Sequence, residues 1–264
     1  MQTLHIIKIG GNILDSPAKL ESFLLDFAAL PEPKLLIHGG GKIASTIGKK
    51  LGIEPNMVEG RRITDAETLK LVTMVYAGLV NKNVVAQLQS MSCNAIGLTG
   101  ADANIIPASK RPVKQIDYGF VGDVAGPETI NATVLDTFLK SGLTPVCAPL
   151  THDKVGNLLN TNADTIASVL ATAMAHLYQV KLIYCFEKKG VLQDADNDES
   201  VISRINKKSY KQLKEDGIVT LGMIPKLDNA FAALDQGVSA VIIGDAAEIN
   251  TIVAGGEAGT LISL

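Results

Sequence analysis

The central signal in this sequence is the stretch Leu35-Leu36-Ile37-His38-Gly39-Gly40-Gly41-Lys42. Its apolar first half predicts a short buried strand, and the apolar spacing of Ile43, Ile47 and Leu51 then predicts a helix. Glycines at such a turn let a ligand approach the backbone, and the N-terminus of the helix offers unpaired N–H groups that attract an anion. The stretch therefore predicts an anion site where a strand ends.

A second strand-to-glycine turn lies near the N-terminus. The segment 4–9 is strand-like, Lys8 stands at its end, and Gly10 and Gly11 follow. Ligands of open α/β sheets bind beyond the carboxyl ends of the strands, so this lysine is well placed to meet a phosphate. A solvated lysine at a strand end would explain Lys8 alone, but the neighbouring glycine turn favours a functional role.

Bulk composition restricts the class of protein. The chain has 264 residues, of which 47% are hydrophobic and 19% are charged, as expected for a soluble globular protein with a real core. The net charge of −3 gives no electrostatic reason to expect nucleic acid or an anionic membrane as a partner. Cys93, Cys147 and Cys185 are widely spaced, which predicts buried thiols in a reducing compartment. Without a signal peptide or a long apolar run, we expect a cytoplasmic protein.

Predicted strands and helices alternate along the chain, which implies an α/β fold with a mostly parallel sheet covered on both faces. Residues 103–127 lack a helical period and are expected to form hairpins or a lid. The pattern restarts near 177–180, so we expect an N-terminal half, 1–178, and a C-terminal half, 179–264. The predicted strands are 4–9, 35–38, 95–98, 144–148, 182–185, 240–243 and 261–262. Besides the helix that follows the glycine turn, the predicted helices are 17–30, 64–91, 129–140, 163–177, 207–215, 225–235 and 245–253.

The longest predicted helix, 64–91, is expected to open with a capping box at Thr64-Asp65-Ala66-Glu67. Apolar residues at helical spacing predict the side of this helix that faces the core. They are Leu69, Val72, Tyr76, Leu79 and Val80.

Several polar residues stand next to predicted helix starts. Arg61 and Arg62 precede one helix, and a guanidinium fork suits a carboxylate, although surface arginines in a loop explain them equally well. The segment 160–164 contains two asparagines and Asp164, more polar side chains than ordinary capping requires. Lys226 falls in the first turn of a helix, where a cation opposes the helix dipole unless an anion is bound.

Other assignments of the glycine turn differ in strength. Gly39-x-Gly41-x-x-Ala44, with Glu59 about 20 residues further on, fits a loose NAD(P)-binding pattern, so an oxidoreductase remains an alternative. An esterase would need a G-x-S-x-G elbow, which this sequence lacks, and the sequence has no Walker A loop.

The acidic run 194–199 departs from the EF-hand pattern of calcium sites, and the histidines lack the spacing of metal ligands. We therefore predict no metal held by protein ligands.

Taken in order, the motifs of this chain resemble those of the amino acid kinase family. The resemblance covers essentially the whole chain and implies a three-layer αβα sandwich with an open, mostly parallel central sheet. The motifs are Lys8-Ile9-Gly10-Gly11, His38-Gly39-Gly40-Gly41, Gly60-Arg61-Arg62-Ile63-Thr64, Asn160-Thr161-Asn162-Ala163-Asp164, Gly222-Met223-Ile224-Pro225-Lys226 and Gly259-Thr260.

The resemblance also implies roles for individual residues. Lys8 and Lys226 would stabilise a transferring phosphoryl group, and Asp164 would position both lysines. The implied contacts to the acceptor substrate come from Gly40, Gly41, Arg62 and Asn160. The implied nucleotide contacts come from Gly10, Gly11, Glu187, Gly190, Val191, Thr220 and Gly222.

The activity that the resemblance implies is ATP-dependent phosphorylation of the γ-carboxylate of N-acetyl-L-glutamate, or of another N-acyl-L-glutamate such as the N-succinyl compound, in arginine biosynthesis. The acceptor carboxylate is already ionised near pH 7, so no general base is needed. Residues 1–178 would bind this substrate and form a homodimer, whereas residues 179–264 would bind ATP. Phosphates and water would hold Mg²⁺.

Two segments depart from the family pattern. Cys185–Gly190 contains Phe186 and Glu187 where the family usually has a small hydroxyl residue and Asp, and Leu221 precedes Gly222 where Gly or Asp is common. Both departures fall in the implied nucleotide half. They leave open a non-catalytic sensor of amino acid or nucleotide. The sequence also lacks the N-terminal helical extension of arginine-inhibited members, so we expect no inhibition by arginine.

Overall fold

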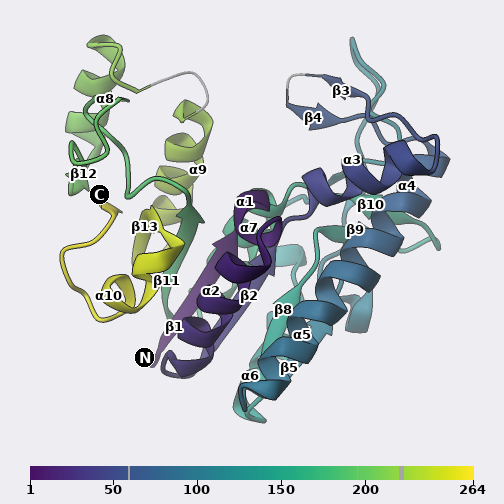
Figure 1. Cartoon of the computed structure of the whole chain (residues 1–264), viewed down its shortest axis with the longest axis horizontal. Helices are drawn as coiled ribbons and strands as arrows, with labels where there is room; N and C mark the ends of the chain where they lie inside the picture. The colour runs from purple at the N-terminus through teal and green to yellow at the C-terminus, as the bar shows by residue number, and fades with distance from the viewer. Residues whose placement is uncertain (59, 195, 220–222) are drawn as a thin grey trace.

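The computed structural model describes residues 1–58, 60–194, 196–219 and 223–264. Its centre is an eight-stranded sheet with the order β12-β14-β13-β11-β1-β2-β8-β5 (Figure 1). Of the neighbouring pairs in this sheet, only β13 and β14 are antiparallel, so the expectation of a mostly parallel sheet is confirmed. The strands are β1 (Thr3–Ile9), β2 (Lys34–His38), β5 (Ala95–Leu98), β8 (Thr144–Cys147), β11 (Gln179–Phe186), β12 (Arg204–Ile205), β13 (Ala240–Asp245) and β14 (Thr260–Ile262).

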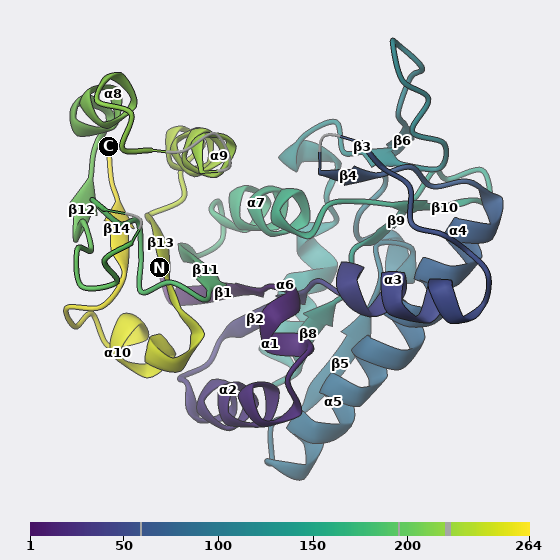
Figure 2. The ribbon, with the colours of Figure 1, turned by 45° about the horizontal axis from the view of Figure 1, so that its top comes forward.

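Helices cover both faces of the sheet, which confirms the three-layer αβα sandwich (Figure 2). One apolar core packs against α6, α7, α8 and α9, and a second packs against α1, α2, α5 and α10. These helices are α1 (Gly11–Leu14), α2 (Pro17–Ala29), α5 (Asn81–Ser90), α6 (Ala132–Lys140), α7 (Ala163–Met174), α8 (Lys207–Glu215), α9 (Ile224–Asp235) and α10 (Ile249–Val253). No helix in the described part of the chain combines the length and the apolar character needed to span a membrane.

The middle of the sheet brings distant parts of the chain together. The strand β1 lies between β2 and β11, and Lys8 pairs in register with Ile37 on one side and Tyr184 on the other. After β1 the chain continues into β2, which pairs with one side of β1, whereas β11 pairs with the other side of β1. The carboxyl ends of these strands therefore meet where the strand order reverses, which is where open α/β sheets bind ligands.

The segment predicted as one helix over 64–91 consists of three parts. These are α4 (Ala66–Val72), a π-helix η1 (Thr73–Val80) and α5. A π-helix bonds residue i to i+5, so each turn takes more residues and the apolar face rotates. Val72, Tyr76 and Val80 are buried as expected, but Leu79 is 47% exposed, so its predicted burial is wrong.

The N-terminal caps of two helices also differ from the prediction. Asp65, rather than a capping box at Thr64, caps α4 by accepting a hydrogen bond from the Thr68 N–H at 2.8 Å. The predicted helix 129–140 begins later, at Ala132, after the N-cap Asn131. In both places a short polar side chain satisfies a free N–H group of the first turn.

Short two-stranded hairpins lie outside the central sheet. The predicted hairpin region contains β6 (Ser109–Lys110) paired with β7 (Gly122–Asp123), which confirms that expectation. Two further hairpins were not predicted, because strands of two or three residues carry almost no periodic signal. They are β3 (Met57–Val58) with β4 (Arg61–Arg62) and β9 (Leu150–His152) with β10 (Leu158–Asn160).

Candidate active site

An ion pair joins the end of β1 to the start of α7. Lys8 Nζ lies 2.7 Å from Asp164 Oδ1, and the two side chains are only 10% and 22% exposed. Asn162 is the N-cap of α7 and accepts a hydrogen bond from the Asp164 N–H at 2.8 Å, which holds this turn in place. The structure thus brings together two residues that the sequence analysis assigned to one task.

Lys226 lies in the first turn of α9, as predicted, and is partly buried. Its ammonium lies 3.6 Å from the centroid of the Phe186 ring. Burial lowers the pKa of Lys226 below its ordinary value of 10.5, while Asp164 opposes this shift and Lys8 adds to it. The two lysines and the carboxylate therefore act on one another electrostatically.

A cavity of about 380 Å³ lies beyond the carboxyl ends of β1, β11 and β13. It is large enough for part of a nucleotide or a small acid. Six residues from the sequence analysis line it: Lys8, Gly10, Gly11, Glu187, Gly190 and Lys226. The cavity also has walls that the sequence analysis did not assign to the site, including Asn12, Ile13, Met223 and Ile243.

The two glycine turns abut each other. The Gly39 N–H donates to the Ile9 carbonyl at 3.2 Å, and a Cβ atom at Gly39 would lie 4.0 Å from the Gly11 nitrogen. Gly40 has a φ of +150°, and a Cβ atom there would lie 2.9 Å from the Tyr76 ring. Gly41 begins α3 (Gly41–Lys50), and the first N–H groups of a helix have no partner within it. The turns can therefore present backbone donors to an anion.

His38 supports the second glycine turn from inside. It is fully buried, with Nδ1 2.7 Å from the Gly39 carbonyl oxygen and Nε2 3.1 Å from Asn81 Nδ2. Burial lowers the pKa of His38 to about 4, so the ring is neutral near pH 7. Assigning the proton to Nδ1 satisfies both contacts, which makes His38 a structural support of the turn.

Arg62 and Asn160, the residues assigned to the acceptor substrate, lie on separate hairpins. Arg62 is 8% exposed, and its Nη2 donates to the Gly41 carbonyl at 2.8 Å and to Ser45 Oγ at 2.7 Å. Asn160 Nδ2 donates to Thr64 Oγ1 at 2.9 Å. Arg62 is thus tied to the glycine turn, whereas Asn160 is held by the chain that follows Arg62.

The remaining nucleotide assignments differ in their surroundings. Glu187 is exposed at the cavity wall, whereas Val191 is 3% exposed and packs into the core. Gly190 is required for close packing, because a Cβ atom there would lie 2.6 Å from Thr260 Oγ1. The Val191 N–H donates a hydrogen bond to the same hydroxyl at 2.8 Å. The assignments of Thr220 and Gly222, and the departure at Leu221, fall outside the described residues.

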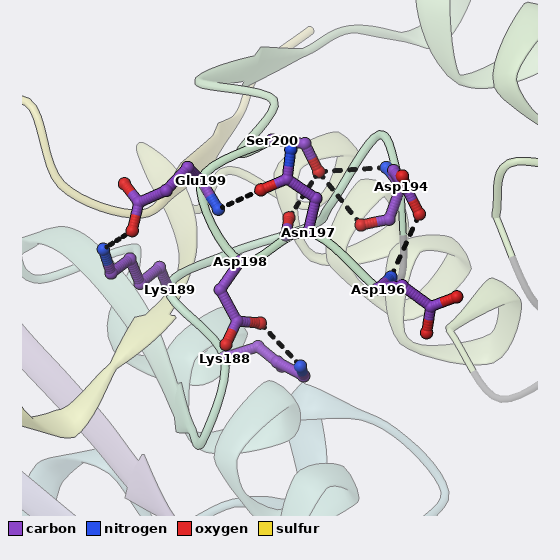
Figure 3. Close-up of polar contacts among 8 residues, drawn as sticks. All are labelled: Lys188, Lys189, Asp194, Asp196, Asn197, Asp198, Glu199 and Ser200. Atoms are coloured by element: carbon purple, nitrogen blue, oxygen red, sulfur yellow. Dashed lines mark hydrogen bonds and ion pairs between the residues drawn. The ribbon is translucent and has the colours of Figure 1, made fainter.

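A loop with two ion pairs follows β11 (Figure 3). Lys188 pairs with Asp198 at 2.6 Å, and Lys189 pairs with Glu199. Ser200 adds hydrogen bonds to the backbone of Asp194. All four ion-pair side chains are more than 40% exposed, so each pair contributes little to stability. Asp198 and Glu199 are thus paired with lysines of the same loop.

The described residues contain no group of three or more His, Cys, Asp or Glu side chains that converges on one point. Near the cavity, the Asp164 carboxylate is already paired with Lys8. These residues do not fit a metal held mainly by protein ligands.

Sequence reasoning did not assign Tyr76, Ser45 or Thr64 to the site. Tyr76 lies under Gly40, Ser45 accepts a hydrogen bond from Arg62, and Thr64 accepts one from Asn160. Tyr76 was recognised only as a buried residue, and a serine one turn into α3 carries no pattern of its own. These contacts depend on tertiary folding, which gives no local signal.

An open αβα sheet with glycine turns and cations at the carboxyl ends of its central strands defines an α/β protein with a candidate anion site beyond the sheet. The chain belongs to the amino acid kinase family, whose family model matches residues 3–245.

Its similarity to individual proteins agrees with this assignment. It is 62% identical over 244 residues to an acetylglutamate kinase from Cytophaga hutchinsonii, covering 92% of this chain and 91% of that protein. The crystal structure of smu.665 from Streptococcus mutans UA159 is similar with a TM-score of 0.76 and 28% identity, covering 98% of both chains. A carbamate kinase from Giardia lamblia bound to AMP-PNP shares the fold, with a TM-score of 0.71, 14% identity and coverage of 99% of this chain and 98% of that one.

Proposed function

We propose that this protein is an ATP-dependent kinase that phosphorylates the γ-carboxylate of N-acetyl-L-glutamate, a step of arginine biosynthesis. An oxygen of the carboxylate attacks the γ-phosphorus of ATP, the bond to the bridging oxygen breaks, and ADP leaves. The product is an acyl phosphate. The observation that carries the proposal is that Lys8, which is paired with Asp164, and Lys226 line one cavity.

The charges of this cavity suit the reaction. In phosphoryl transfer, negative charge spreads over the transferring oxygens, and catalysis consists mainly of positioning and electrostatic stabilisation. Lys8 and Lys226 supply the cations, and the backbone N–H groups of Gly11 and Gly41 supply neutral donors. Asp164 keeps Lys8 in place and offsets the repulsion between the two ammonium groups.

We also propose that the two halves of the chain divide the substrates. Residues 1–178 would bind the acceptor through Gly40, Gly41, Arg62 and Asn160, and residues 179–264 would bind ATP with help from Gly10 and Gly11. The strand order supports this division, because β12, β14, β13 and β11 form one half of the sheet and β1, β2, β8 and β5 form the other.

Several further features belong to the proposal. Mg²⁺ would accompany ATP and be held by phosphates and water. The enzyme would act as a cytoplasmic homodimer.

Coupled ADP release tests the activity directly. The expected result is turnover that requires both ATP and N-acetyl-L-glutamate. Binding of ATP without transfer to any N-acylated glutamate would identify a sensor of the same fold instead. Binding of NAD(P) without binding of ATP would support the oxidoreductase alternative.

One observation favours a substrate with a larger, acidic acyl group, such as N-succinyl-L-glutamate. Asp123 accepts hydrogen bonds from Arg111 Nε at 3.0 Å and Nη2 at 2.6 Å, whereas the buried Nη1 has no partner among the described residues. This hairpin lies next to Asn160, whose N–H donates to the Phe120 carbonyl at 2.9 Å. A succinyl carboxylate would offer Nη1 a partner, whereas an acetyl group would not.

The ratio of kcat/KM for the N-succinyl and N-acetyl substrates separates these cases. If Arg111 binds the acyl carboxylate, Arg111→Gln lowers the ratio. If it only supports the hairpin, both values change together.

A further inference from the structure

The Phe186 ring lies close to both lysines of the site. Its centroid is 3.6 Å from Lys226 Nζ and 5.5 Å from Lys8 Nζ. The Tyr184 ring stacks against it from the same face of β11, with centroids 6.3 Å apart and planes inclined by 19°. Phe186 is thus an uncharged side chain that both lysines approach.

The charged groups around Lys226 explain what its contact with the Phe186 ring contributes. Asp164 contacts Lys8 directly, but within the described residues no carboxylate lies within 4.0 Å of Lys226 Nζ. The charged groups around Lys226 are Asp164 from α7, Lys8 from β1, and Glu187 and Lys188, which line the same cavity after β11. The face of an aromatic ring carries partial negative charge and attracts an ammonium group, most strongly where water is excluded.

We propose that Phe186 is a positioning residue that holds the Lys226 ammonium at the phosphoryl-transfer position before the nucleotide binds. This inference deepens the proposed function and rests on it. The ring attracts the cation without carrying a full charge, so it does not compete with phosphate as a carboxylate would. The phosphates of a nucleotide can then bind the Lys226 ammonium without first breaking an ion pair.

The position of Phe186 supports a role beyond core packing. It is the last residue of β11, it is only partly buried, and it lines both the cavity of about 380 Å³ and an adjoining cavity of about 350 Å³. A phenylalanine needed only for the core would be enclosed, as Phe27 is at 0% exposure. The ring therefore presents its face to the site.

Substitutions at Phe186 test the kinetic consequence. Phe186→Leu keeps an apolar side chain but removes the aromatic face, and it should lower kcat/KM for ATP roughly 3- to 30-fold, the range of one cation–π contact. Phe186→Tyr should restore most of the activity. The matched control is Phe27→Leu, because the Phe27 ring lies 5.4 Å from Lys34 Nζ away from the cavity. This control should leave the KM for ATP and the pH profile unchanged.

A measurement without turnover separates this inference from the proposed activity. In protein labelled with ¹³C at the lysine ε-carbon, NMR should show the Lys226 methylene protons shifted upfield by the ring, and Phe186→Leu should abolish that shift. The Phe186→Leu protein should also titrate Lys226 at a lower pH, because burial remains while the attraction of the ring is lost.

The outcomes are distinguishable. An absent ring-current shift in the wild-type protein, or a Phe186→Leu protein that titrates and turns over as the wild type does, would overturn the inference. A wild-type protein that shows the NMR signature but no kinase activity would overturn the proposed function and leave the contact itself established.

Discussion

Asp164 Oδ1 stands 2.7 Å from Lys8 Nζ, so a helix N-terminus and the end of the central strand are joined by an ion pair that is largely shielded from water. Tyr184 adds a hydrogen bond from its hydroxyl group to the Asp164 carbonyl at 3.3 Å. Both partners belong to regular secondary structure, Lys8 to β1 and Asp164 to α7. Removing one partner leaves the charge of the other, largely buried partner without a neighbouring opposite charge.

Asp164→Asn should therefore lower kcat at least about 100-fold, the effect of losing one group that stabilises developing charge. The amide keeps the size of the side chain but no longer orients the Lys8 ammonium or offsets its charge. The measurement is steady-state ADP release with circular dichroism as a check of folding. Asp235→Asn is the matched control, because Asp235 forms an exposed ion pair with Lys207 and should have nearly normal kcat. A folded Asp164→Asn enzyme of normal kcat would refute the role.

The pH dependence of the reaction should reveal Lys226. Burial holds its pKa below 10.5 in the free enzyme, and only the protonated form can stabilise phosphoryl oxygens. As pH rises through this lowered pKa, kcat/KM should fall, because kcat/KM reports ionisations of the free enzyme. Bound nucleotide favours the ammonium, so the alkaline limb of kcat should lie at higher pH. Lys226→Arg should remove the limb; an unchanged limb in this variant would assign it to another group.

Arg62 should act mainly on the acceptor substrate. Its guanidinium is held by the Gly41 carbonyl and by Ser45, which points it at the glycine turn. Arg62→Lys loses the fork that binds a carboxylate at two points, so the KM for the acyl-glutamate should rise roughly 10- to 100-fold while the KM for ATP stays nearly constant. The neighbour on the same short strand, Arg61, is exposed, and Arg61→Lys serves as the control. Equal effects of the two substitutions would contradict the assignment.

The fold was predictable from sequence wherever local chemistry agreed with tertiary structure. Lys226 lies in the first turn of α9 as predicted, and its unfavourable interaction with the helix dipole there is the reason to expect a functional cation. The alternation of strands and helices likewise predicted the parallel sheet. The two glycine turns needed no tertiary information, since glycine itself marks a turn that a ligand can approach closely.

The rest depended on contacts between distant residues. The segment Thr73–Val80 is a π-helix, in which Leu79 is exposed. The residue types of this segment do not predict i→i+5 hydrogen bonds. Phe186 could be recognised as unusual but not as a contact of two lysines, since Lys8 and Lys226 reach it from opposite ends of the chain. The pairing of Asn160 with Thr64 likewise needs two hairpins to meet.

Gly40 should be the glycine least tolerant of a side chain in the second turn. Two costs add in Gly40→Ala: a φ of +150° that L-residues rarely adopt, and a Cβ atom 2.9 Å from the Tyr76 ring. Together they should lower the free energy of unfolding by roughly 2–5 kcal/mol, measured by urea denaturation.

Gly52→Ala isolates the backbone cost, because Gly52 has a φ of +75° and a Cβ atom added there would meet nothing within 4 Å. In that control variant, the free energy of unfolding should fall by only about 1–2 kcal/mol. The excess at Gly40 should shrink when Tyr76→Leu relieves the overlap, since contacting residues do not contribute additively. If Gly40→Ala and Gly52→Ala were equally destabilising, the Tyr76 ring would not be what restricts position 40, and the packing beneath the second glycine turn would have to be looser than the structure indicates.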